Sequence, residues 1–294
     1  MEKISAKKMI FPTKSPDMWF GAEYNLNIYR GCSHGCIYCD SRSDCYHIEQ
    51  FDTVRVKDEA LRKIRNELSH KSKTGVIASG AMSDPYNPLE EKLELTRHSL
   101  ELMAAYGFGA FLTTKSPLVQ RDMDVLREIV EFSPALVAFT VTTIEDALCK
   151  KIEQRVAVTS ERLQAMAHLS AAGIPTGALL MPLLPWINDT PENVSGILQG
   201  IKDAGGKFVY PAFGLTMRDG QREFFYTKLE EEFPGMQTKY EKAFGLRYQC
   251  SSPKAKKLWA FFREECDRLE LLYEMPAIIH WYRGKYREKQ ISFF

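Results

Sequence analysis

The segment RGCSHGCIYCD, residues 30–40, contains three of the seven cysteines of this 294-residue chain. Cys32, Cys36 and Cys39 have the spacing C-x3-C-x2-C, which allows three thiolates to surround one face of an iron–sulfur cube. The small Gly31 and Gly35 let the backbone come close to such a group. Three ligands leave one iron of a [4Fe-4S] cluster open, and a catalytic cluster needs an open position. We therefore expect these cysteines to hold a [4Fe-4S] cluster that carries the chemistry of the protein.

Two other interpretations of these cysteines are open. A zinc site would take His34 or Cys45 as its fourth ligand, and three structural cysteines would bind nothing. A disulfide framework is not expected, because the number of cysteines is odd and three of them are crowded together. Crowded cysteines in a reducing compartment favour metal binding.

The composition is that of a globular protein. Hydrophobic residues make up 45% and charged residues 26% of the chain, which is enough for a sizeable core and a charged surface. No apolar run has the length of a signal peptide or a membrane span, so we expect a cytoplasmic protein with no membrane partner. The formal net charge is +1, so binding to nucleic acid would need a local basic patch.

Short apolar runs alternate with longer amphipathic runs along the chain, which predicts an α/β protein made of repeated βα units. We expect six strands, at residues 24–29, 76–80, 109–114, 135–142, 176–181 and 207–213. Helices are expected at residues 58–69, 95–106, 121–132, 160–172 and 191–204. Six such units predict a parallel sheet that curls, either as a doubly wound sheet or as a partial barrel.

The chain divides into three parts on this interpretation. Residues 1–20 are an N-terminal extension, and residues 21–220 are the core barrel. Residues 221–294 are predicted to be mainly helical, with a long helix at residues 253–273. We expect this last part to pack on the barrel as a cap.

Polar side chains follow several of the predicted strands. In both sheet architectures, ligands bind at the carboxyl ends of the strands. The candidates at these ends are Ser83 and Asp84 after the second strand, Lys115 after the third, and Thr140 and Thr142 on the fourth. We therefore expect a binding site at this edge of the sheet.

The cysteine segment, directly after the first strand of a βα repeat, resembles the radical S-adenosylmethionine (SAM) superfamily. The signature of that superfamily is C-x3-C-x2-C with an aromatic residue before the last cysteine, a place that Tyr38 fills here. The resemblance implies a partial (β/α)6 barrel, an open iron that binds SAM, and reductive cleavage of SAM to a 5'-deoxyadenosyl radical. It also implies a one-electron reductant such as flavodoxin or ferredoxin.

Further segments resemble a narrower group. They are IASGAMSDPYNPLEEKLELTR at residues 77–97, LTTKSP at 112–117, FTVTTIEDALCKKIEQR at 139–155 and SERLQAMAHLSAAGIPTGALLMPLLPWIND at 160–189. With the cysteine segment they are similar to the spore photoproduct lyase family, in its DNA repair photolyase-like branch, over residues 20–285. The resemblance implies a lyase-like enzyme that acts on DNA or another nucleic acid. The alternatives are a radical SAM enzyme for a peptide or small metabolite, and a non-catalytic iron–sulfur or zinc protein.

The family resemblance also implies residues that bind SAM. Lys115 and Thr140 match SAM-binding positions of the family, and Tyr38 would lie over the SAM beside the cluster. An ammonium group and hydroxyls can hold the carboxylate and ribose oxygens of SAM. A structural role, such as capping a neighbouring helix, is the alternative for each. Further contacts are expected from Ser83, Asp84, Thr142 and Arg155.

One departure from the family concerns its catalytic cysteine, which donates a hydrogen atom. The family has this cysteine just before the Ser-Asp that ends the second strand, whereas residues 78–84 of this chain are ASGAMSD, without a thiol. The reversal of a thymine dimer is therefore not carried over. Cys45 and Cys250 are the candidates for a substitute donor, while Cys149 and Cys266 lie in amphipathic stretches where a structural role is expected.

Two segments combine basic and aromatic residues, a pattern that can neutralise phosphates and stack bases. One is Arg247–Tyr248, and the other is HWYRGKYREKQ at residues 280–290. The alternative is a solvated basic surface whose aromatic residues pack on the barrel.

Overall fold

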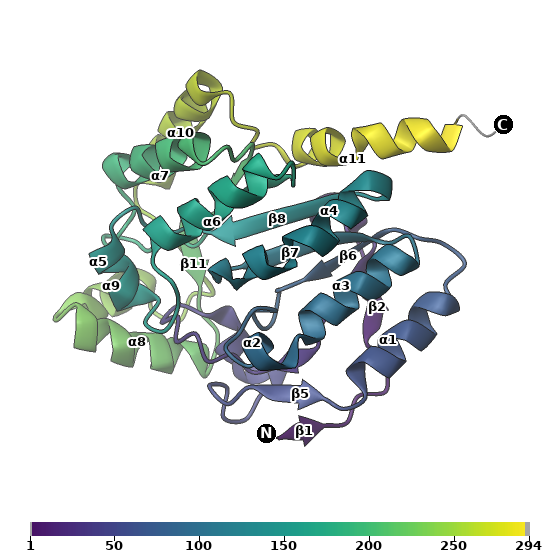
Figure 1. The fold of residues 1–294 in the computed structure, drawn as a ribbon. Helices are drawn as coiled ribbons and strands as arrows, with labels where there is room; N and C mark the ends of the chain where they lie inside the picture. Colours follow the sequence, from purple (N-terminus) through teal and green to yellow (C-terminus); the bar gives the residue numbers. More distant parts are fainter. Residues whose placement is uncertain (1, 292–294) are drawn as a thin grey trace.

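A seven-stranded sheet forms the centre of the molecule (Figure 1). The computed structural model describes residues 2–291, and the side chains up to residue 286. The strand order is β10-β9-β8-β7-β6-β3-β2. β2 pairs with β3 in the antiparallel sense, and every other neighbouring pair in this sheet is parallel. The strands are β2 (Ile10–Pro12), β3 (Tyr24–Leu26), β6 (Val76–Ser79), β7 (Gly109–Thr114), β8 (Ala135–Thr140), β9 (Thr176–Leu180) and β10 (Val209–Pro211).

The helices that connect the parallel strands cover one face of this sheet (Figure 1). Side chains alternate along a strand, so Ala110 and Leu112 of β7 pack in the core beneath these helices. Phe111 between them points to the opposite face, where its ring stacks on Phe20. The helices are α1 (Ala60–Ser69), α2 (Glu90–Leu93), α3 (Leu95–Ala105), α4 (Met123–Phe132), α5 (Asp146–Ile152), α6 (Thr159–Ala171) and α7 (Pro191–Asp203).

This arrangement confirms the prediction of a partial barrel. A doubly wound sheet would have its connecting helices on both faces, whereas here they lie on one. Six parallel strands, β3 and β6 to β10, occupy the six predicted segments. The first predicted segment, residues 24–29, divides into β3 and the start of a separate strand, β4 (Tyr29–Arg30), which leaves the main sheet.

Two smaller sheets accompany the main sheet. β4 joins β5 (Arg55–Lys57) and β1 (Lys3–Ile4), so the chain turns away from the main sheet just before Cys32. The second small sheet pairs β11 (Gly214–Thr216) with β12 (Gln249–Ser251). The short 3-10 helices are η1 (Pro16–Met18), η2 (Asp40–Arg42), η3 (Asp44–Tyr46) and η4 (Pro117–Asp122).

The C-terminal part is mainly helical, as the sequence predicts. The helices are α8 (Gln221–Glu232), α9 (Met236–Phe244), α10 (Ala255–Leu269) and α11 (Met275–Ile291). α10 packs against α7. It ends before the predicted residue 273, because Glu270 takes a left-handed conformation with φ of 56° and Leu272 forms a parallel bridge with Phe208. We propose that the three predicted parts of the chain meet at residues 20 and 220. The pairing of β11 with β12 then connects the core barrel to the C-terminal part.

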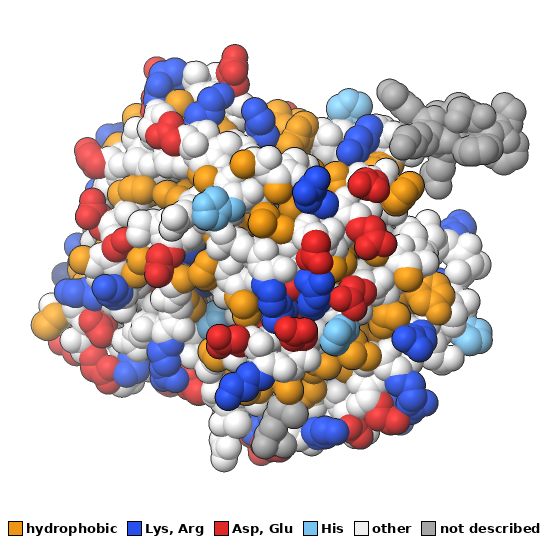
Figure 2. Space-filling model, in the orientation of Figure 1, with side chains coloured by type: hydrophobic (Ala, Val, Ile, Leu, Met, Phe, Trp, Pro, Cys, Tyr) orange, Lys and Arg blue, Asp and Glu red, His pale blue; other side chains and the backbone are white. Residues whose placement is uncertain are grey.

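The face shown in Figure 2 carries basic and acidic side chains side by side, with apolar side chains between them. This mixture agrees with the formal net charge of +1. None of the helices in residues 2–291 combines the length and the apolar character that crossing a bilayer requires.

Candidate functional site

A cavity of about 600 Å³ lies at the carboxyl ends of the parallel strands. This is the edge at which parallel α/β folds bind their ligands. The cysteine segment forms one part of its wall, and the loop after β6 forms another. β12 of the C-terminal part also contributes, through Gln249 and Ser251. The cavity therefore brings together segments that are far apart in the sequence.

All three cysteines of the segment line this cavity as free thiols. The backbone N–H of Cys32 donates to Phe51 O at 2.8 Å, which anchors the start of the segment. Gly31 has a φ of +80°, and a Cβ there would lie 2.5 Å from Thr53 O. A side chain at this position would therefore displace the segment.

Burial sets the protonation of these thiols in the absence of a metal. It raises the pKa of Cys32 to about 11 and raises the pKa values of Cys36 and Cys39 as well, although Lys115 opposes the shift at the latter two. Thiols bind metals in their deprotonated form, and iron in iron–sulfur clusters is held by such soft sulfur ligands. Three convergent thiols without disulfide partners fit an iron–sulfur cluster with one open iron.

The proposed fourth ligands of a zinc site have other partners. His34 Nδ1 lies 3.5 Å from Asp84 Oδ2, and the exposed Cys45 Sγ lies 3.2 Å from Arg218 Nη1. Among the side chains of residues 2–286, no three His, Cys, Asp or Glu groups come together as ligands of one ion. The ligands of a four-iron cube bind separate irons and lie farther apart. The geometry favours the cluster over a zinc ion.

Asp84 joins the ends of β6 and β7 beside the cysteine segment. Its carboxylate accepts hydrogen bonds from Thr114 Oγ1 at 2.7 Å and from the Lys115 backbone N–H at 2.8 Å. Ser83 Oγ donates to Gly31 O at 2.6 Å. Both Ser83 and Asp84 line the cavity. Their observed bonds fix the shape of its wall.

Lys115 brings a cationic group to the cavity. Its side chain makes no hydrogen bond or ion pair with the residues that the structure describes, and its Nζ lies 5.8 Å from the centre of the Tyr38 ring. Burial works against the charge, but Cys36 and Glu153 outweigh it and raise the pKa of Lys115. The ammonium group can therefore bind an anionic ligand. Thr140 and Tyr38 line the same cavity.

Two of the predicted contact residues do not reach the cavity lining. Thr142 is fully buried behind it, with Oγ1 3.2 Å from Glu153 Oε1. The Arg155 side chain is 59% exposed, lies beside Gly35 and places Nη1 4.0 Å from Asp52 Oδ1. The chain turns after Glu153 and carries Arg155 to the outer side of the cysteine segment. The structure therefore does not support Thr142 and Arg155 as contacts to a ligand in the cavity.

The two candidate hydrogen donors also lie elsewhere. Gln249 and Ser251 of β12 face the cavity, so the pleat turns Cys250 to the other side. Cys250 is buried in an apolar cluster, with Sγ 3.5 Å from Arg247 O. Within the described residues, the only cysteines that line the cavity are those of the cysteine segment, so Cys45 is also outside it.

Sequence reasoning missed an ion pair behind the cavity wall. Glu153 Oε2 and Arg162 Nη2 are 2.5 Å apart, and both side chains are fully buried. The Tyr38 hydroxyl donates to Glu153, and Arg162 Nη1 donates to Thr140 O at 2.9 Å. The sequence does indicate that Arg162 is buried. It occupies the same helix face as Thr159 and the apolar residues of α6 that are buried. A charged residue on a core-facing stripe indicates a buried partner.

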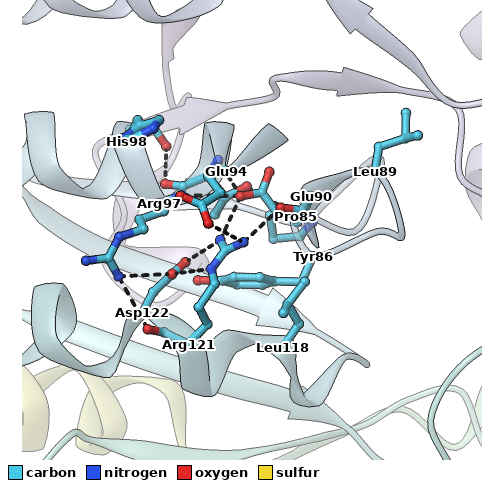
Figure 3. A network of polar contacts seen from close by, with 12 residues as sticks. Pro85, Tyr86, Leu89, Glu90, Glu94, Arg97, His98, Leu118, Arg121 and Asp122 are labelled. Atoms are coloured by element: carbon cyan, nitrogen blue, oxygen red, sulfur yellow. Dashed lines mark hydrogen bonds and ion pairs between the residues drawn. The ribbon is translucent and has the colours of Figure 1, made fainter. Parts of the chain in front are cut away.

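A second buried network lies behind the loop that follows β6 (Figure 3). Arg121 points between Glu90 and Asp122, with Nη2 2.9 Å from Glu90 Oε1 and Nε 2.7 Å from Asp122 Oδ1. The backbone N–H of Thr96 donates to the same Glu90 oxygen at 2.9 Å, while Thr96 Oγ1 donates to Pro85 O at 2.6 Å. This network holds the loop in place without reaching the cavity lining.

Two uncharacterized proteins are similar to this chain in sequence. An uncharacterized protein of Methanocaldococcus jannaschii is 35% identical over 189 residues, which cover 64% of this chain and 69% of that protein. An uncharacterized protein of Mycobacterium tuberculosis is 29% identical over 228 residues, which cover 75% of this chain and 67% of that protein.

Solved structures of low sequence identity share the fold. Spore photoproduct lyase complexed with dinucleoside spore photoproduct has a TM-score of 0.67 at 14% identity, and the match covers 91% of this chain and 79% of that one. The radical SAM methyltransferase TsrM of Kitasatospora setae, with tryptophan and a SAM analogue bound, has a TM-score of 0.57 at 10% identity. That match covers 91% of this chain and 62% of the methyltransferase.

The family model described as the Radical SAM superfamily matches residues 26–194, which is more than half of the chain. Enzymes of this superfamily use a [4Fe-4S] cluster and SAM, so the two predicted cofactors are confirmed. They also need an electron donor. The chain is a radical SAM enzyme and belongs to the radical SAM superfamily.

Proposed function

We propose that Cys32, Cys36 and Cys39 hold the [4Fe-4S] cluster and that SAM binds in the adjoining cavity. The observation that carries this proposal is the meeting of three free thiols with the Lys115 ammonium group in one cavity. When bound there, the cluster and SAM supply reductive cleavage to a 5'-deoxyadenosyl radical. A flavodoxin or ferredoxin would be the one-electron donor.

Different residues of the chain have different roles in binding SAM. Lys115 is suited to the SAM carboxylate, because a cation pairs with it in a site with little competing water. Tyr38 forms the wall beside the cysteines, and Thr140 offers a hydroxyl at the end of β8. Ser83 and Asp84 keep the loop after β6 in position through the bonds described above. We give Thr142 and Arg155 no direct contact.

The apolar wall of the cavity protects reactive species. Trp19, Phe111 and Phe213 line it, and such surfaces exclude the water that would allow side reactions. A flat, uncharged group of a substrate could pack against these rings. Because no thiol except those of the cysteine segment lines the cavity within the described residues, the proposal assigns no protein thiol as a hydrogen donor.

We further propose a nucleic acid as the substrate, with a reaction that resembles that of the spore photoproduct lyase family. The support is a set of exposed cations close in sequence to cavity residues, which we call the basic rim and define as Arg247, Lys254, Lys256 and Lys257. These four exposed residues flank the cavity residues Gln249 and Ser251 in sequence, and they form no ion pairs with other described residues. Cations of this kind bind the phosphates of a nucleic acid.

An aromatic side chain accompanies the basic rim. Tyr248 is 45% exposed, its hydroxyl accepts a hydrogen bond from Arg218 Nη2 at 2.9 Å, and the same guanidinium lies 5.0 Å from its ring. A ring held in this way can stack on a base. In the other basic segment, residues 280–290, one cation already has a partner within the protein, because Arg283 Nη2 lies 2.6 Å from Glu23 Oε1. Its Arg287 and Lys289 side chains lie outside the described residues.

The alternative is a radical SAM enzyme that acts on a peptide or a small metabolite. The composition of the cavity favours this alternative at one point, because Lys115 is the only Lys or Arg among the described residues of its lining. A substrate held entirely inside the cavity would therefore be mostly uncharged. A nucleic acid would place one base inside and its phosphates on the rim.

Reversing the charge of the three rim lysines tests the choice of substrate. A triple variant, Lys254→Glu, Lys256→Glu and Lys257→Glu, is compared with Arg65→Glu, Lys73→Glu and Lys92→Glu. The second triple changes the net charge equally, at exposed residues outside the cavity lining that form no ion pair with another described side chain. Anisotropy of a fluorescent single-stranded oligonucleotide is measured with the reconstituted enzyme at about 50 and about 200 mM salt.

We expect the rim variant to bind the oligonucleotide far more weakly and to lose most of the salt dependence, with the control triple close to wild type. SAM cleavage with dithionite should be the same in all three proteins, because the rim lies outside the SAM site. Equal binding by both triples would contradict the role of the rim. Absence of binding by the wild type would contradict a nucleic acid substrate and favour the small-molecule alternative.

A further inference from the structure

The buried pair of Glu153 and Arg162 occupies an unusual place. Removing two charges from water is costly, and a well-packed apolar pair would often be as stable. Here both side chains have no exposed surface, and they lie directly behind the cysteine segment. A pair buried at this cost is expected to hold neighbouring groups in position.

Each member of the pair holds one residue of the cavity wall. Glu153 accepts the hydroxyl hydrogen bond of Tyr38, which belongs to the cysteine segment. Arg162 Nη1 donates to the carbonyl oxygen of Thr140, at the end of β8, at 2.9 Å. Tyr38 and Thr140 both line the cavity. The ion pair therefore connects two separate segments of the wall that faces SAM.

The pair is also connected to the cysteine segment through the backbone. Cys36 and Glu153 form an antiparallel β-bridge, and the N–H of Ile37 donates to Ile152 O at 3.0 Å. A shift of Glu153 would thus move the middle cysteine. The other polar contacts of the pair are Thr142 Oγ1 at 3.2 Å from Glu153, Ala157 O at 2.9 Å from Arg162 Nε, and Cys149 Sγ at 3.4 Å from each partner.

The charges of the pair reach the cavity. The Glu153 carboxylate accepts the Tyr38 hydrogen bond and its backbone is bridged to Cys36, so its negative charge lies beside the cysteine segment. The same carboxylate helps to raise the pKa of Lys115. Arg162 offsets the carboxylate, so a change of either partner alone alters the electric field at the cysteine segment.

We propose that Glu153 and Arg162 are positioning residues, which hold Tyr38 and Thr140 in the wall of the SAM site and whose balanced charges set the reduction potential of the cluster. This inference depends on the proposed role of Cys36 as a cluster ligand. It adds two functions to the pair, one geometric and one electrostatic. Separate variants can remove each function.

Glu153→Gln removes the negative charge and keeps an oxygen that can accept the Tyr38 hydrogen bond. Tyr38→Phe removes that hydrogen bond and keeps both charges. The matched control is Glu90→Gln in the network of Figure 3, where a carboxylate buried beside an arginine is neutralised away from the cavity lining. Each protein is reconstituted anaerobically with iron and sulfide, and its iron content is measured first.

Two readouts then follow on the reconstituted proteins. The reduction potential is obtained from a redox titration monitored by electron paramagnetic resonance, and the SAM dissociation constant from the change that SAM causes in the same spectrum. We expect Glu153→Gln to shift the potential to a more positive value, because the Arg162 cation is left unbalanced. Tyr38→Phe should weaken SAM binding about tenfold and leave the potential near that of wild type.

A purely structural role would lower iron content and stability in both variants without moving the potential of the cluster that remains. The inference is overturned if Glu153→Gln has the wild-type potential and Tyr38→Phe has the wild-type SAM affinity. An equal shift of potential in Glu90→Gln would also overturn it. If the wild-type protein itself binds no iron, the proposed function fails first, so the two failures are distinguishable.

Discussion

Two buried networks of this protein each pair a glutamate with an arginine, but they lie in different places. One pairs Glu153 with Arg162 behind the cysteine segment, and the other places Arg121 between Glu90 and Asp122 behind the loop after β6 (Figure 3). The first bonds directly to Tyr38 and Thr140, which line the cavity, whereas the second bonds to the loop after β6 at Pro85, outside the lining. The comparison separates what stabilises the barrel from what shapes its site.

The two networks also differ in how much of the arginine reaches solvent. The Arg162 side chain is fully buried, but that of Arg121 is 20% exposed. Glu90 keeps hydrogen bonds from the Tyr29 hydroxyl and the Thr96 backbone when Arg121 is absent. Removing one charged partner should therefore lower the free energy of unfolding most in the network behind the cysteine segment.

The largest effect is expected for Arg162→Met. This variant leaves the fully buried Glu153 carboxylate without its cation, and breaking a buried pair from one side costs about 3–5 kcal/mol. Urea unfolding followed by circular dichroism measures the loss. SAM binding by the reconstituted variant should be lost as well, because Thr140 O no longer has its donor. Stability close to wild type would contradict the importance of the pair.

A smaller effect is expected for Arg121→Met. Glu90 and Asp122 each lose a hydrogen-bonding cation, while the other donors to Glu90 remain, so the free energy of unfolding should fall by about 1–3 kcal/mol. The same urea experiment gives the value. SAM affinity of the reconstituted enzyme should stay at the wild-type level. An equal loss of SAM affinity in the two arginine variants would contradict the claim that only the Glu153–Arg162 network shapes the SAM site.

The smallest effect concerns acid pH. Burial alone would raise the pKa of Glu153, but Arg162 and Lys115 outweigh it and lower that pKa below the usual 4.5. A carboxyl with a lowered folded-state pKa contributes stability above its unfolded value, and this contribution is lost as the pH falls through the folded value. Unfolding free energies of wild type and Glu153→Gln should therefore converge as the pH falls below about 4.5. A constant gap down to acid pH would contradict the ionised state of Glu153.

The sequence predicts the strands and the strand-end residues well, because both depend on local patterns. The apolar run of residues 109–114 becomes β7, so Lys115 had to lie at its carboxyl end. The spacing of the cysteine segment likewise indicates three convergent thiols before any tertiary contact is known. These features require only the periodicity of a strand and the common edge of a parallel sheet.

The rest of the site depends on contacts that local patterns do not contain. Glu153 meets Tyr38 only because an isolated bridge joins it to Cys36. Arg155 follows two residues later, yet a turn carries it to the outer surface. Cys250 lies on the short strand β12 within a part predicted to be mainly helical. The pleat that turns its thiol away from the cavity was therefore not foreseen.

The central claim is that the cysteine segment binds a cluster that cleaves SAM. The most direct test reconstitutes wild type, Cys36→Ala and the control Cys266→Ala anaerobically with iron and sulfide, and then adds SAM and dithionite. Cys266 is buried in the core away from the cavity. We predict that wild type and Cys266→Ala form 5'-deoxyadenosine, detected by mass spectrometry, and that Cys36→Ala forms none. Formation of equal amounts by Cys36→Ala, or of none by wild type, would contradict the claim.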